Sequence, residues 1–126
     1  MGMFDTFKSR KKIDETYFQE QLNKKIRRTG YLKNNIRDGQ WIFYYQNGQI
    51  AIEASYKESL RSGSWKEWHW LSTPKVEGQF SADRKIGEWK EFHNNGNLKE
   101  KGVYQKNKKQ GSWDLAWYSG SFWRTL

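Results

Sequence analysis

The triplet Gly-x-Trp occurs four times in this chain, and 24 residues separate each copy from the next. When the glycine is counted as the first position, the sixteenth position is small and the eighteenth is aromatic in each of the first three units. A fixed period without insertions is the signature of a repeat architecture, in which each unit packs mainly on its neighbours. The four triplets are Gly39-Gln40-Trp41, Gly63-Ser64-Trp65, Gly87-Glu88-Trp89 and Gly111-Ser112-Trp113.

Turn signals divide each unit into two strands of about six residues. Asn47-Gly48 and Asn95-Gly96 are typical of a tight turn between two β-strands. After the first of these turns, apolar and small side chains occupy alternate positions from Ile50 to Tyr56, which is the period of a half-buried strand. Each unit is therefore predicted to be a β-hairpin, and the hairpins to join end to end.

The small residue at the sixteenth position has a specific predicted role. Glycine inside a strand often marks a close approach of another group to the backbone. We expect it to leave room for an indole ring from a neighbouring strand to lie flat across the backbone. The residues at this position are Ala54, Gly78 and Gly102, and Gly30 stands in the same register 24 residues before Ala54.

Residues 1–29 do not follow the period. Asp14 is a candidate helix N-cap, Phe18, Leu22 and Ile26 form a stripe with i, i+4 spacing, and basic residues precede Gly30. This pattern predicts a short helix that caps the open first edge of the sheet. Ile26 at the start of the first strand is the alternative.

The predicted fold is therefore all-β, an elongated antiparallel meander of about four 24-residue hairpins with a short N-terminal helix. The two predicted parts are a basic N-terminal helix or cap over residues 1–29 and a repeat domain over residues 30–126.

Composition narrows the classes of function. The chain has 126 residues, 23 Lys and Arg against 14 Asp and Glu, and no cysteine, which excludes a disulfide scaffold, a zinc ribbon and thiol catalysis. The longest apolar run, residues 41–45, is too short to span a membrane, and residues 1–12 contain no apolar core of a secretory signal. We expect a cytoplasmic protein.

No pattern of residues indicates an enzyme. His69 and His93 share one position of the repeat, as do Glu67 and Glu91, so the repeat itself explains their spacing. A structural role is favoured for both pairs. A two-histidine metal site and a carboxylate acid–base pair are the alternatives, but no cysteine and no further carboxylate column completes a ligand set. We predict no catalytic residues, no metal and no cofactor.

The repeat resembles the variant MORN repeat, where MORN stands for membrane occupation and recognition nexus. The resemblance rests on Gly-x-Trp-x-x-aromatic, then Asn-Gly, then an alternating strand, and it covers residue 30 to the C-terminus. Leu71-Ser72 replaces Asn-Gly in the second unit, which predicts a different and more protruding turn there, and Ala116 replaces an aromatic residue in the fourth. Bacterial chains with this repeat include an antitoxin family, and eukaryotic MORN repeats are associated with phospholipid binding and scaffolding.

Positive charge gathers in the loops that close the units, and these loops are expected to lie along one edge of the sheet. The opposite edge, at residues 46–49, 70–73, 94–97 and 118–121, carries no charge. Such a basic border either keeps the sheet soluble or binds an anionic partner. Its predicted anion-binding residues are Lys33, Arg37, Lys57, Arg61, Arg84, Lys85, Lys106, Lys108 and Lys109.

The favoured function is that of a protein-binding module, such as an antitoxin or immunity-type inhibitor that covers the site of a toxin or other enzyme. Tyrosine and tryptophan are common anchors of such interfaces. The predicted contact residues, expected to be partly exposed, are Tyr45, Trp68, Trp70 and Tyr118.

The alternatives are binding of nucleic acid and binding of an anionic phospholipid surface through the basic edge. Nucleic acid is disfavoured because the basic and aromatic side chains are expected to segregate rather than interleave.

Overall fold

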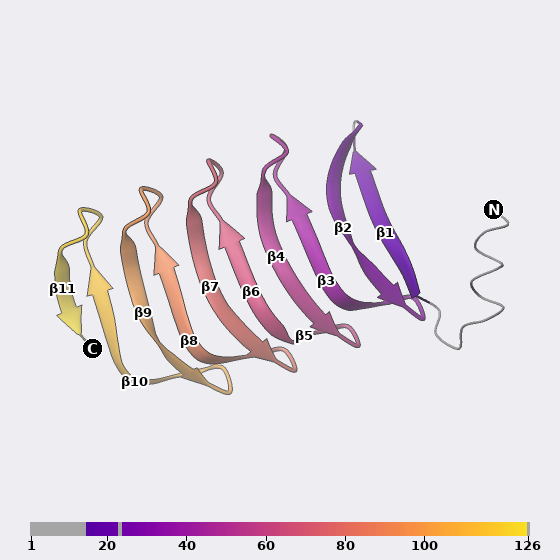
Figure 1. The fold of residues 1–126 in the computed structure, drawn as a ribbon. Coiled ribbons are helices and arrows are strands. Elements are labelled where there is room, and N and C mark those ends of the chain that lie inside the picture. The colour runs from indigo at the N-terminus through magenta and orange to yellow at the C-terminus, as the bar shows by residue number, and fades with distance from the viewer. Residues whose placement is uncertain (1–14, 23, 126) are drawn as a thin grey trace, which may run out of the picture.

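The computed structural model describes residues 15–22 and 24–125, and these form one antiparallel sheet. Ten strands follow one another across the sheet in chain order, and the two-residue strand β5 pairs with β4 beside β6. Figure 1 shows them side by side in a single layer from β1 to β11. The described residues contain no helix, which confirms the all-β meander. The strands are β1 (Glu15–Leu22), β2 (Lys25–Lys33), β3 (Ile36–Tyr44), β4 (Ile50–Lys57), β5 (Leu60–Arg61), β6 (Gly63–Trp68), β7 (Pro74–Ser81), β8 (Arg84–Phe92), β9 (Leu98–Gln105), β10 (Lys108–Ala116) and β11 (Phe122–Thr125).

One face of the sheet carries the four repeat tryptophans and is called the tryptophan face below. The indole of Trp89 lies flat on the backbone of Gly78, because a Cβ atom added at that glycine would stand only 2.0 Å from Cδ2 of the ring. Trp41 lies in the same way on Gly30, and Trp113 on Gly102. The predicted role of the small residue is confirmed at these three positions. A single-layer sheet can thereby bury large rings, and Trp41 is only 2% exposed.

The rings also form a continuous row across the strands. Trp65, Phe80 and Trp89 pack edge to face with ring centroids 5.1 Å apart at each step, and Tyr104 continues the row to Trp113. Edge-to-face pairs of this kind each contribute about 0.5–1.5 kcal/mol beyond the area they bury. The aromatic row is thus the core of the molecule, and every unit contributes to the core of the next.

The other face carries mainly charged side chains in one cross-strand row. Strand pairing places Glu53 opposite Lys66, Lys66 opposite Glu77, and Glu77 opposite Lys90. Opposite charges that face each other across strands stabilise a sheet slightly. This face, called the charged face below, is therefore a solvated surface on which the charges alternate from Glu53 to Lys90, while Lys90 also stands opposite Lys101.

The turn at Leu71-Ser72 has the same backbone as the Asn-Gly turns, so the expectation of a protruding turn is wrong. The N–H of His69 donates to the carbonyl of Thr73 at 2.7 Å, as that of Tyr45 does to Gln49 at 2.8 Å. Ser72 adopts φ of 74°, close to the 89° of Gly48. A serine thus accepts the left-handed conformation that usually selects glycine.

The expected N-terminal helix is wrong for the described residues, since they form β1 and β2; Asp14, its expected N-cap, lies outside them. Phe18 packs on Trp41 with centroids 5.6 Å apart, opposite Gly30, while Leu22 and Ile26 are exposed. The physical reason is that the free edge of β2 needs a hydrogen-bonding backbone, which a strand supplies and a helix does not. Ile26 lies in β2, as the alternative assignment had it, and β2 runs through the predicted boundary at residue 30.

In the part of the chain that the structure describes, no helix exists that is long and apolar enough to cross a bilayer.

Candidate binding surfaces

Four cations of the predicted basic border lie over the aromatic row and are called the basic column below. They are Arg37, Arg61, Lys85 and Lys109, each four residues before a repeat tryptophan. Their charged groups stand 4.4–5.9 Å from the centroid of that tryptophan ring. The strand register explains why these side chains lie on the tryptophan face. Arg37 pairs across its hairpin with Leu32, and the other three pair with aromatic residues, namely Tyr56, Phe80 and Tyr104. Basic and aromatic side chains therefore interleave on the tryptophan face, and the expectation that they segregate is wrong.

An acidic side chain neutralises Arg61 of the basic column. Its Nε donates to Oδ1 of Asp83 at 2.8 Å, and its backbone N–H donates to the same oxygen at 2.9 Å. The side-chain hydrogen bond from Arg61, followed by the backbone one, lowers the pKa of Asp83 below its ordinary value. Asp83 therefore stays ionised, and it holds the β7–β8 turn against Arg61, which lies just after the turn between β4 and β5.

Lys109 is held by a carboxylate on the tryptophan face. Its Nζ lies 3.0 Å from Oε2 of Glu100 and 4.4 Å from the centroid of the Trp113 ring. The hydrogen bond to Glu100 raises the pKa of Lys109, and burial opposes the shift. This lysine is engaged within the fold.

The remaining residues of the basic border differ in exposure. Lys33 is half-buried, whereas Lys57, Arg84, Lys106 and Lys108 are exposed in or beside the turns. The predicted border therefore consists of the inner column of four that covers the core, the half-buried Lys33, and four outer cations that face solvent.

The uncharged turns lie together along the opposite edge, called the neutral turn edge below, and hydrogen bonds join each turn to the next. The amide of Asn47 donates to the carbonyl of Trp70 at 3.2 Å, and that of Asn95 to Tyr118 at 2.7 Å. Tyr45 donates from its hydroxyl to the carbonyl of Trp68 at 2.5 Å. These bonds fix the spacing of the turns.

The two histidines make the same kind of bond between units. Nε2 of His69 lies 3.0 Å from the carbonyl oxygen of Phe92, and Nε2 of His93 lies 3.1 Å from that of Ala116. Because a carbonyl only accepts, both rings donate from Nε2. No group of three His, Cys, Asp or Glu side chains within residues 15–22 and 24–125 is arranged to hold a metal ion.

Large apolar side chains are exposed along the neutral turn edge. Leu71 is 81% exposed, Trp70 48%, and Trp117 and Tyr118 are 56% each. Of the four predicted contact residues, Trp70 and Tyr118 are thus well exposed, while Tyr45 and Trp68 are half-buried. Sequence reasoning missed Leu71 and Trp117. Its position in the repeat could have identified Leu71, because the first and third units have the polar residue asparagine at the same point of the turn.

The repeated glutamates are engaged in separate interactions. Glu67 accepts a hydrogen bond from Nε1 of Trp65 at 2.9 Å, and Glu91 pairs with Lys99 at 3.4 Å. The two glutamates therefore do not converge on one point, and their arrangement does not resemble an acid–base pair.

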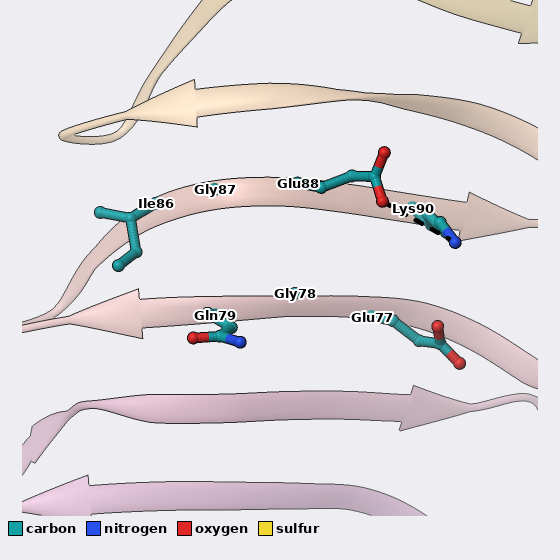
Figure 2. A pocket seen from close by; sticks show the side chains of 7 residues that line it. All are labelled: Glu77, Gly78, Gln79, Ile86, Gly87, Glu88 and Lys90. Atoms are coloured by element: carbon teal, nitrogen blue, oxygen red, sulfur yellow. Dashed lines mark ion pairs between the residues drawn. The ribbon is translucent and has the colours of Figure 1, made fainter.

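A shallow hollow on the charged face lies behind Gly78, between β7 and β8, as Figure 2 shows. The pairing of these strands is interrupted there, between Glu77 and Gln79. Lys90 pairs with Glu88 at 3.8 Å, the contact drawn as a dashed line in Figure 2. The hollow thus follows from the opening of the strands at Gly78, and two of its charged lining groups, Glu88 and Lys90, pair with each other.

Comparison with known families gives one match, at two places in the chain. The family is described as MORN repeat variant, and the matched segments are residues 37–58 and 85–106. Their starts are 48 residues apart, which is two periods of the 24-residue repeat. No curated protein matches the chain. The two in-phase matches and the hairpin period together support a MORN repeat protein.

Proposed function

We propose that this protein is a non-enzymatic binding module that recognises a protein partner through the neutral turn edge. The observation that carries the proposal is the row of exposed Trp70, Leu71 and Tyr118 in turns that carry no charge. Aromatic side chains are enriched and charged ones depleted at the centres of protein interfaces. MORN repeats are commonly binding modules, which agrees with this role.

The hydrogen bonds between turns support the proposal energetically. Asn47, Asn95 and the two histidines hold neighbouring turns at fixed spacing before any partner arrives. A preorganised surface loses less conformational entropy on binding, so more of the contact energy appears as affinity.

We further propose that the protein is cytoplasmic and acts as an antitoxin or immunity-type inhibitor, which covers the site of a toxin or other enzyme. A rigid row of aromatic turns suits this task, because it occludes a site by occupying it and requires no chemistry of its own.

A second candidate is an anionic partner, either nucleic acid or a phospholipid surface, bound through the outer cations. Lys57, Arg84, Lys106 and Lys108 are exposed and carry the charge that such a partner requires. The repeat tryptophans, however, are at most 9% exposed, so they offer no platform on which bases can stack.

The experiment compares two variants in affinity capture from native lysate, with and without nuclease and at low and high salt. The first carries Trp70→Gln, Leu71→Asn and Tyr118→Asn. Other units have Gln46, Asn47 and Asn94 at the corresponding positions, so the fold is expected to be retained. The second replaces the four outer cations with glutamine.

Loss of a nuclease-resistant and salt-resistant protein partner from the first variant alone supports the proposed function. Loss from the second variant alone, with steep dependence on salt, refutes it in favour of the anionic partner. Inhibition of the captured protein's activity by the wild type, and not by the first variant, tests the inhibitor role.

A further inference from the structure

A second hollow lies on the tryptophan face, between the first hairpin and the first Gly-x-Trp unit, and is called the first-unit hollow. It has a volume of about 340 Å³. Its apolar lining consists of Phe18, Leu32, Ile36 and Trp41, and its polar lining of Arg28, Arg37, Asn35 and Ser59. An apolar floor with a few charged groups at the rim is the usual composition of a ligand site.

The hollow arises where the repeat departs from its own pattern. Leu32 stands at the position that Tyr56, Phe80 and Tyr104 hold in later units. Phe18 takes the place of a repeat tryptophan, since it faces Gly30 as Trp65 faces Gly78. Both replacements are smaller than the rings that fill the later intervals, so space remains above the backbone.

The charge pattern of the first unit also differs from that of the second unit at this hollow. In the next unit, the backbone N–H of Asp83 donates to the carbonyl of Arg61 at 2.8 Å, and its carboxylate neutralises that arginine. One period earlier, the N–H of Ser59 donates to the carbonyl of Arg37 at 2.7 Å, but serine brings no charge. Among the residues the structure describes, no carboxylate pairs with Arg37.

The guanidinium of Arg37 is held in place without such a partner. It lies 4.8 Å from the ring centroid of Trp41 and 5.3 Å from that of Tyr56, and Nη1 donates to the Tyr56 hydroxyl at 3.3 Å. Arg28, across the hollow, is already paired with Glu20 at 2.7 Å. Within the described part of the chain, the hollow therefore presents one oriented cation without a paired carboxylate beside an apolar floor.

We propose that the first-unit hollow binds an aspartate or glutamate side chain of a partner protein, flanked by apolar residues. The carboxylate pairs with Arg37 and takes the part that Asp83 plays for Arg61. The neighbouring apolar side chains lie on Phe18, Leu32 and Trp41. Arginine suits this role because its planar fork binds a carboxylate through two parallel hydrogen bonds. The inference rests on the proposed protein-binding function, but it concerns a different surface.

The test uses a defined peptide probe and therefore does not depend on finding the partner. Acetyl-Leu-Glu-Phe amide is titrated into the full chain, and the indole N–H signal of Trp41 and the Nε–H signal of Arg37 are followed by NMR. The matched peptide with glutamine in place of glutamate tests the need for the charge. Hydrocinnamate tests whether a free carboxylic acid binds as well as a peptide.

Two protein variants complete the design. Ser59→Asp supplies the missing carboxylate from within the chain, at a position where Asp83 shows that aspartate fits, so it should occupy Arg37 and weaken peptide binding about tenfold or more. Asn107→Asp makes the same change of charge two periods later, beside Lys85, and should bind the peptide like the wild type.

Localised shifts with the glutamate peptide, and their loss in Ser59→Asp alone, support the proposal. Equal binding of the glutamine peptide, undiminished binding by Ser59→Asp, or no shift at Trp41 and Arg37 overturns it. Tighter binding of hydrocinnamate than of the peptide also overturns it, because the site would then select a small acid. None of these results depends on Trp70, Leu71 or Tyr118, so they are independent of the test of the neutral turn edge.

Discussion

Gly30→Ala should be far more destabilising than the same change at Gly78, although both glycines lie under an indole. At Gly30 the new Cβ would stand 2.0 Å from Cδ2 of Trp41, whereas non-bonded carbons prefer about 3.5–4.0 Å. The ring must move, and its Nε1 then loses the 2.9 Å hydrogen bond to the carbonyl of Tyr31. No carboxylate replaces that acceptor, since Phe43 stands where two later units have glutamate.

The magnitude follows from three contributions. Overpacking of a tight core costs about 1–3 kcal/mol, and a buried donor left without a partner costs about 1–3 kcal/mol. Removing a glycine from the unfolded chain returns about 0.4–1 kcal/mol. The net loss is about 3 kcal/mol, which corresponds to a fall of roughly 10 °C in melting temperature for a chain of this size.

At Gly78 the chain has an alternative arrangement that it already uses. Ala54 occupies this position in the preceding interval, and there the indole of Trp65 donates to Glu67 instead of to a carbonyl. Trp89 has Glu91 at the same spacing, so Gly78→Ala can adopt that geometry and should lose about 1 kcal/mol. Urea unfolding followed by tryptophan fluorescence measures both variants. Equal losses, or a Gly30→Ala variant as stable as the wild type, would refute this reasoning.

Three further predictions concern the core, the loss of stability at acidic pH, and the basic column. Trp89→Ala removes ring contacts to Phe80 and Tyr104 and should cost about 3–5 kcal/mol in chemical denaturation; a loss no larger than that of a surface substitution would contradict the stacked core. Because the folded-state pKa of Asp83 is lowered, its contribution to stability is present above the ordinary value of 3.8 and is lost as the pH falls through the folded value. Asp83→Asn, which copies Asn107 of the next unit, should therefore have a melting temperature that falls less steeply with acid below about pH 4, and parallel curves would rule this out. Lys109→Gln should lower the free energy of unfolding by about 1 kcal/mol, because it removes the contacts to Trp113 and Glu100, while Lys108→Gln should change it by less than about 0.5 kcal/mol; urea titration of both variants checks the difference.

The sequence alone determined the features that are local to one unit or that repeat with it. The 24-residue period, the Asn-Gly turns and the alternation after them identified the hairpins, because strand pairing between consecutive segments follows from turn chemistry and side-chain period. The glycines that face Trp41, Trp89 and Trp113 were also readable, since a missing side chain leaves room for a ring to lie on the backbone. The absence of charge along residues 46–49, 70–73, 94–97 and 118–121 marked one edge in the same way.

Only the tertiary structure decided the features that depend on strand register and on the open ends of the sheet. The basic column appeared in the sequence as loop charge, but strand pairing sets Arg61, Lys85 and Lys109 opposite aromatic residues and so turns them onto the core. Residues 15–22 have a helical pattern, yet they form a strand, because the open edge of β2 requires backbone partners. The lack of a paired carboxylate at Arg37 emerged only from contacts between residues 22 apart, in which Ser59 and Asp83 hold equivalent places. These outcomes rest on contacts between segments that are distant in sequence, and the pattern within one unit does not contain them.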